Sequence, residues 1–108
     1  MADTAPPWRN NPPMARTGLA MEVIPALRLQ MAECDEQRGD PVAAGRRAAL
    51  WRAQQHAART DRTLADLRRF CLDGLARHRL LDVEGPTYLR GYREGLQAVL
   101  RDIRRVER

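Results

Sequence analysis

Few residues in this chain are of a type suited to chemistry. The soft metal ligands and candidate nucleophiles are Cys34, Cys71, His56 and His78, and the chain contains no serine. Cys71 and His78 are seven residues apart. That spacing separates them by roughly 10 Å along a helix, too far to hold one metal ion. Because the chain also has no CxxC or HxxxH motif, we expect no metal, no cofactor and no enzymatic activity.

The remaining polar motifs also favour a structural interpretation. Cys34 and Cys71 fall on apolar helical stripes, as expected for buried free thiols in a reducing compartment. The neighbouring carboxylates Asp35 and Glu36 lie at the end of an expected helix, where they are solvated charges. No glycine joins a strand to a helix, so the sequence predicts no phosphate-binding loop.

Arginine dominates the charge of the chain. All nineteen basic residues are Arg, against fourteen acids, and the net charge is +5. Residues 1–41 carry four Arg and six acids, whereas residues 42–81 carry nine Arg and three acids. A polyanion would therefore meet the middle of the chain first. The alternative interpretation is that the Arg content reflects a GC-rich genome. The candidate polyanion-binding residues are Arg46, Arg47, Arg52, Arg59 and Arg62.

The sequence of residues 1–18 predicts an extended arm that precedes a single helical domain of residues 19–108. Two proline pairs in the arm oppose helix and strand alike and favour polyproline geometry. Trp8 follows the first pair, and a lone Trp on a stiff arm is suited to a pocket on a neighbour, since Trp is enriched at binding hot spots. The alternative is a disordered tail. The candidate partner-binding residues of the arm are Pro6, Pro7, Trp8, Pro12 and Pro13.

Helix signals begin after the arm. Pro25 removes an internal hydrogen bond, so it should begin a helix or kink one. From there an apolar stripe runs to about Gln37. Gly39 suits the left-handed position after a helix, Asp40 suits an N-cap, and Pro41 suits a first helical turn. This Gly-Asp-Pro predicts a short turn between two antiparallel helices.

A long helix is expected from Pro41 to about Leu80, because no proline interrupts this segment. The doubtful point is Ala58–Asp61, where Thr60 or Asp61 could cap a new helix. We favour continuity, since no glycine or proline lies there. The apolar positions of this segment are Ala43, Leu50, Ala53, Ala57, Leu64, Leu67, Cys71 and Leu75.

A last helix should start at Pro86 and run to the terminus. Its apolar residues recur at steps of three and four, the pattern of a helix-packing seam. A second strip of small residues predicts close approach by another backbone, either that of the 41–80 helix within the domain or that of another molecule. Tyr88 and Tyr92 could stack on bases, although Tyr92 lies on the seam and favours a core position. The seam is Leu89, Tyr92, Leu96, Val99, Ile103 and Val106, and the strip is Gly91, Gly95 and Ala98.

Short turns make neighbouring helices antiparallel. With an unbroken 41–80 helix, two hairpins share one rod and leave apolar surface uncovered, so the chain would need further copies of itself or another protein to cover it. With a break near Thr60, four helices could instead close into a self-sufficient bundle.

The segment Tyr88–Leu100, YLRGYREGLQAVL, resembles the closing helix of many small uncharacterised proteins encoded among the structural genes of tailed bacteriophages and gene-transfer agents. Those proteins often end in a Leu-Arg-Gly…Leu…Leu helix after a short acidic turn with a proline, here Asp82–Pro86. The resemblance covers about a fifth of the chain. It implies a virion or assembly component repeated around a larger shell, portal or tail, and it implies no catalytic residues.

We therefore expect a non-enzymatic all-α structural or assembly protein that acts by helix packing and arm docking, with protein partners or as a homo-oligomer. One alternative is a small Arg-rich nucleic-acid-binding or regulatory protein, and another is an inhibitor that caps an enzyme. No segment approaches the ~20 apolar residues of a membrane span, and the N-terminus lacks the apolar region of a signal peptide. We expect cytoplasmic synthesis, no membrane association and, for a virion component, residence in the virion.

Overall fold

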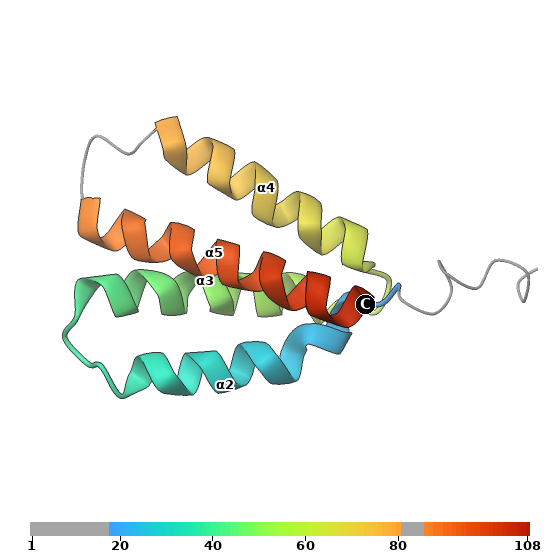
Figure 1. The fold of residues 1–108 in the computed structure, drawn as a ribbon, viewed down its shortest axis with the longest axis horizontal. Helices are drawn as coiled ribbons and strands as arrows, with labels where there is room; N and C mark the ends of the chain where they lie inside the picture. Colours follow the sequence, from blue (N-terminus) through green and yellow to red (C-terminus); the bar gives the residue numbers. More distant parts are fainter. Residues whose placement is uncertain (1–17, 81–85) are drawn as a thin grey trace, which may run out of the picture.

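The computed structural model describes residues 18–80 and 86–108. They form the 3-10 helix η3 (Ala20–Val23) and the helices α2 (Ile24–Asp35), α3 (Pro41–Ala57), α4 (Leu64–Leu80) and α5 (Pro86–Glu107) (Figure 1). The expected all-α class is confirmed. Consecutive helices alternate in direction, so α3 and α5 run parallel (Figure 1). The expected turn at 82–85 and all five docking residues of the arm lie outside the described residues.

The start of α2 agrees with the prediction from Pro25. Helix α2 begins at Ile24, so Pro25 occupies its first turn, where a missing backbone N–H costs little. The preceding residues form η3 rather than an α-helix. Leu27, Met31 and Cys34 are buried along one side of α2.

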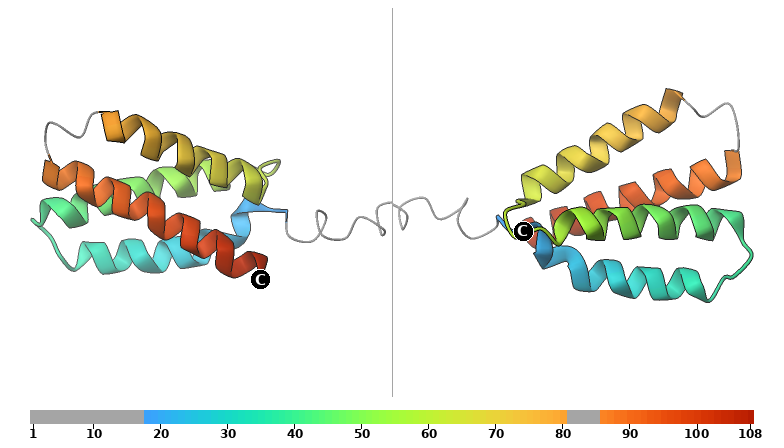
Figure 2. Two further views of the ribbon diagram at one scale, coloured as in Figure 1. Left: turned by 45° about the horizontal axis from the view of Figure 1, so that its top comes forward. Right: turned by 180° about the vertical axis from the view of Figure 1, so that it is seen from behind.

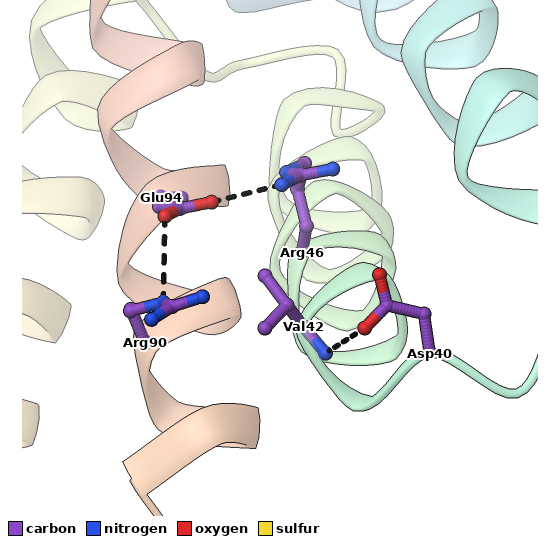
Figure 3. Close-up of polar contacts among 5 residues, drawn as sticks. All are labelled: Asp40, Val42, Arg46, Arg90 and Glu94. Atoms are coloured by element: carbon purple, nitrogen blue, oxygen red, sulfur yellow. Dashed lines mark hydrogen bonds and ion pairs between the residues drawn. The ribbon is translucent and has the colours of Figure 1, made fainter. Parts of the chain in front are cut away.

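The Gly-Asp-Pro turn between α2 and α3 is confirmed in detail. Gly39 has φ +89°, a left-handed conformation that Gly adopts without steric cost. The Asp40 Oδ1 accepts a hydrogen bond from the Val42 backbone N–H at 3.0 Å (Figure 3). Pro41 is the first residue of α3. The turn therefore reverses the chain and caps α3 at the same time.

The expected continuous helix over residues 41–80 is wrong, because α3 ends at Ala57 and α4 begins at Leu64. The break comes from a capping box. The Thr63 Oγ1 accepts from the Asp66 N–H at 3.1 Å, and the Asp66 Oδ2 accepts from the Thr63 N–H at 2.9 Å. These bonds lower the pKa of Asp66. The cap lies two to three residues after Thr60 and Asp61, the positions considered from the sequence.

Gly18 and the first residue of η3, Ala20, hold the α3–α4 loop in place. The Gly18 carbonyl accepts from the Leu64 N–H at 2.7 Å, and the Arg62 carbonyl accepts from the Ala20 N–H at 3.0 Å. The first N–H groups of a helix have no partner inside it, so Gly18 satisfies one of them for α4. The interruption between α3 and α4 is thus stabilised by a segment that is distant in the sequence.

Four helices enclose one core, so the expected open pair of hairpins is also wrong. The seam of α5 faces this core: Tyr92, Leu96, Val99 and Ile103 are buried, while Leu89 and Val106 are half-buried. Apolar residues of the other helices meet them, including Leu27, Leu50 and Leu67. Most of the apolar helix surface that was expected to need a partner protein is therefore buried within the chain.

Helices α3 and α5 cross with their backbones almost in contact. A Cβ atom added at Gly91 would lie 1.9 Å from the Val42 carbonyl oxygen, and one added at Gly45 would lie 2.0 Å from the Tyr88 carbonyl oxygen. At Gly95 the nearest atom would be the Arg46 carbonyl oxygen at 2.7 Å. Glycine at these positions lets two helices pack closer than any side chain would permit, which offsets its ~1 kcal/mol helix cost.

Helix α4 packs chiefly against α5 and touches α3 less. It lies close to both near its start and diverges from α3 toward its C-terminal end (Figure 2). Residues of α3, α4 and α5, among them Arg52, Phe70 and Tyr92, line a small cleft that adjoins the candidate site.

Candidate partner-binding groove

The residues that could do chemistry are occupied with packing. Cys34 and Cys71 are free and buried, and burial raises the pKa of the Cys71 thiol to about 12. A thiol held protonated in this way is a poor nucleophile and a poor ligand. In residues 18–80 and 86–108, no three His, Cys, Asp or Glu residues are placed to hold a metal ion. The side chain of His78 lies outside the described residues.

His56 stacks on Phe70 with ring centroids 4.8 Å apart, which joins the end of α3 to α4. Burial, and then the charge of Arg62, lower the pKa of His56. The imidazole is therefore neutral at physiological pH and packs as an aromatic ring.

The five candidate polyanion-binding arginines do not form one patch. Arg46 contacts the Glu94 carboxylate at 2.8 Å, and Arg90 lies 3.8 Å from the same carboxylate (Figure 3). The hydrogen bond to Glu94 raises the pKa of Arg46. Arg47 is paired with Asp35 at 2.6 Å. These pairs tie α3 to α5 and α2, so two of the five charges are partly neutralised within the fold.

The other three candidate arginines are spread along the bundle. Arg59 and Arg62 lie in the α3–α4 loop, whereas Arg52 lies within α3. Arg52 is exposed and forms no ion pair with the described residues. Of the five, it is the cation best placed to meet a ligand.

A groove of about 400 Å³ opens where α3 meets the first turns of α5. Two of its walls are exposed aromatic side chains: Trp51 is 48% and Tyr88 44% solvent-exposed. Tyr92 closes the inner side as part of the core. We call this cleft the aromatic groove, and its lining is Arg47, Ala48, Trp51, Arg52, Tyr88 and Tyr92.

The close crossing of α3 and α5 builds the aromatic groove. Gly45 and Gly91 bring the two backbones together, and Trp51 and Tyr88 project from either side of that crossing onto one cleft. Because both rings stand on helices rather than on loops, their positions depend on the core that fixes those helices. The shared carboxylate of Glu94 further ties Arg46 of α3 to α5 (Figure 3).

The small cleft lined by α3, α4 and α5 adjoins the aromatic groove. Its volume is about 110 Å³, and it shares Arg52 and Tyr92 with the groove. Helix α4 adds Phe70, Asp73 and Arg77. Among the described residues Asp73 forms no ion pair, so the joined surface offers aromatic rings, unpaired guanidinium and one carboxylate.

Another cleft, of about 310 Å³, lies between α2 and α5, and its polar residues bond to one another across the two helices. Asp102 is buried there and accepts a hydrogen bond from the Gln30 Nε2 at 2.6 Å, with Arg105 at 3.7 Å. Ala98 lines this cleft. The predicted strip therefore divides: Gly91 and Gly95 meet α3 within the chain, as in the intramolecular alternative, whereas Ala98 lies toward α2.

Comparison of the chain with models of protein families, with curated proteins and with solved structures found no match. Within the part of the chain that the structure describes, no helix is both long and apolar enough to cross a membrane.

Trp51 was not among the candidate site residues inferred from the sequence, and Tyr88 was considered only as a base-stacking residue. One signal was available for Trp51. It lies beside the stripe of Leu50, Ala53 and Ala57 rather than on it, so a large ring at this position faces outward. The proximity of Tyr88 had no such signal, since it depends on how α3 and α5 cross.

Proposed function

We propose that this chain is a non-enzymatic all-α interaction protein that binds a protein partner through the aromatic groove, as a structural or assembly component of a phage-type particle. One observation carries the proposal: Trp51 and Tyr88 stand exposed on one groove beside Arg52, which has no ion pair among the described residues. Trp, Tyr and Arg are the residues most enriched at binding hot spots.

The groove can contribute useful binding free energy. Covering the exposed half of Trp51, roughly 100 Å², stabilises a complex by about 2.5 kcal/mol at ~25 cal/mol per Å². Tyr88 offers a further ring with a hydroxyl that can hydrogen-bond at the rim. Since both residues are held on packed helices, a partner would lose little free energy in ordering them.

The role of the α5 seam in this proposal differs from the sequence-based expectation. Leu96 and Ile103 are fully buried within the chain, so the seam stabilises the bundle rather than meeting a partner. The phage-type assignment rests on the resemblance of Tyr88–Leu100, and two residues of that segment, Tyr88 and Tyr92, line the groove.

Site-specific photo-crosslinking tests the proposal. A photo-reactive amino acid placed at Trp51 or at Tyr88 should yield the same discrete protein adduct when the full chain is expressed with the other proteins of its particle. The matched control is Leu72, which is 50% exposed on α4 and lines neither the groove nor the adjoining cleft. No adduct at Trp51 and Tyr88, or the same adduct at Leu72, would contradict a groove-specific partner.

A second candidate function, nucleic-acid binding, is favoured by the exposed rings beside Arg52 and Arg77. Aromatic platforms flanked by cations bind single strands by base stacking and phosphate contact. A labelled oligonucleotide should then bind at about 50 mM salt and lose much of its affinity at about 200 mM. The charge-reversing change Arg52→Glu should weaken it, and an absence of binding at low salt would exclude this function.

A further inference from the structure

We propose that the ligand of the aromatic groove is the N-terminal arm of this protein, with the Pro6-Pro7-Trp8 segment seated against Trp51 and Tyr88. The inference rests on the proposed function, since it names an occupant for the same groove. It is argued from the composition of the arm, the point where the arm joins the bundle, and the charges on both surfaces.

The composition of the arm matches the groove. Proline-rich segments bind grooves lined by aromatic side chains, because proline already has the extended polyproline geometry and loses little entropy on docking. The chain has five aromatic residues. Three of them line the aromatic groove and a fourth, Phe70, lines the adjoining cleft. The fifth is Trp8, which directly follows a proline pair in the arm.

The arm joins the bundle within reach of the groove. Gly18 is held beside the start of α4 by its bond to Leu64. Trp8 precedes Gly18 by ten residues, a length that spans at most about 35 Å. Trp51 is six residues before the end of α3, or ~9 Å along the helix axis. The arm is therefore long enough to reach the groove of its own bundle, and equally that of a second copy.

The volume of the groove suits one anchor residue. A cleft of about 400 Å³ is at the lower end of the volumes that bind drug-sized ligands. It can accept one indole ring with an adjacent proline, but not a folded element.

The charges on the two surfaces predict a salt dependence for docking of the arm that differs from the salt dependence of polyanion binding. The arm carries Arg9 and Arg16 against Asp3, and Arg52 flanks the groove without an ion pair among the described residues, so both surfaces have an excess of positive charge. Docking of the arm must then come from apolar and aromatic contact, and added salt should leave it unchanged or strengthen it by screening the repulsion. A polyanion shows the opposite salt dependence.

The experiment uses the full chain with Trp51→Phe, which keeps a ring in the groove and leaves Trp8 as the sole tryptophan. If the arm docks, Trp8 fluorescence should be shifted to shorter wavelength and quenched by acrylamide several-fold less than in the free peptide of residues 1–17. Adding Tyr88→Ala should release Trp8 to peptide-like quenching, whereas the control Leu72→Ala should not. Raising the salt from about 50 to 200 mM should leave Trp8 protected.

A second variant changes only residues that precede the described part of the chain. Pro6→Ala with Pro7→Ala, in the Trp51→Phe chain, leaves every residue of the described helices unchanged and should still increase the quenching of Trp8. Concentration dependence of the protection assigns the arm to a neighbouring copy, which is then the protein partner of the proposed function. Protection that does not depend on concentration assigns the arm to the same copy, which supports the arm as the ligand but contradicts a groove that binds a separate partner. The inference is overturned if Trp8 is as exposed as in the free peptide, or if Tyr88→Ala leaves it protected. If a partner crosslinks from position 51 while Trp8 is exposed to solvent, this inference is wrong and the proposed function still holds.

Discussion

Replacing Gly91 with alanine should destabilise the bundle although alanine is the better helix former. The added Cβ atom would lie 1.9 Å from the Val42 carbonyl oxygen. The obstacle is backbone, which cannot rotate away as a side chain can. To restore ordinary contact, α3 and α5 must separate by about 1.5 Å at the crossing, since non-bonded heavy atoms pack best at about 3.5 Å.

The size of the effect follows from the core that this movement would loosen. A radial gap of 0.5–1 Å already forfeits about a quarter to a half of the dispersion attraction between two atoms. Leu50, Leu96 and Val99 are fully buried in that core, and overpacking of this kind costs about 1–3 kcal/mol or more. We expect a gross cost of about 3–4 kcal/mol, offset by about 1 kcal/mol of helix propensity. The net loss of about 2–3 kcal/mol should lower the Tm by about 10–15 °C.

Thermal and urea unfolding followed by circular dichroism measures this loss. The matched control is Gly74→Ala on α4, where the nearest atom to the new Cβ is the Cδ1 of Leu96 at 2.8 Å. Because the end of that side chain can shift, clash and helix propensity should nearly cancel. A Gly91→Ala chain as stable as the wild type would refute the close crossing from which the aromatic groove is built.

Three further changes test other parts of the fold. Thr63→Ala removes the cap of α4 and should cost about 1 kcal/mol in urea unfolding, with no loss if α3 and α4 were continuous. His56 has a lowered pKa in the folded protein, so the unfolded chain binds the proton more readily. The contribution of His56 to the free energy of unfolding should therefore be fully present above pH 6.5 and should decline as the pH falls below it. His56→Phe keeps a ring on Phe70 and should flatten this decline in unfolding curves taken at several pH values. Leu96→Asp buries a charge in the core and should abolish cooperative unfolding in calorimetry; a folded Leu96→Asp chain that only fails to assemble would restore the seam as a partner surface.

Local rules predicted the helices well where a short segment contains its own signals. Pro25 and the Gly39-Asp40-Pro41 turn were interpreted correctly because caps and proline act within a few residues. The apolar positions of residues 41–80 were also assigned correctly, since Leu50, Leu64 and Leu67 are all buried. The break between those residues was missed because the absence of glycine and proline was given more weight than a cap at Thr60 or Asp61, and the Thr63…Asp66 capping box was not recognised.

What the sequence could not predict depends on contacts between distant segments. The loop before α4 is held by Gly18 and Ala20, and no local pattern connects these residues. The same limit applies to the candidate site. Gly91 and Gly95 predicted a close approach, and the expected 41–80 helix was its partner within the domain, but nothing in the spacing identified Gly45 or the α3 part of that segment as the point of contact. The aromatic groove follows from that crossing, so its residues could not be grouped from spacing alone.

The crossing of α3 and α5 therefore couples the stability of the bundle to the shape of the groove, and the two can be separated by choosing where to substitute. A change at Gly45 or Gly91 moves two helices and must affect folding and binding together. A change at Trp51 or Tyr88 removes rings that are about half exposed, so it should reduce binding while leaving the unfolding free energy almost unchanged. If Tyr88→Ala instead lowered stability as much as Gly91→Ala, Tyr88 would be a core residue, and the argument that the groove exists to bind a ligand would lose its main support.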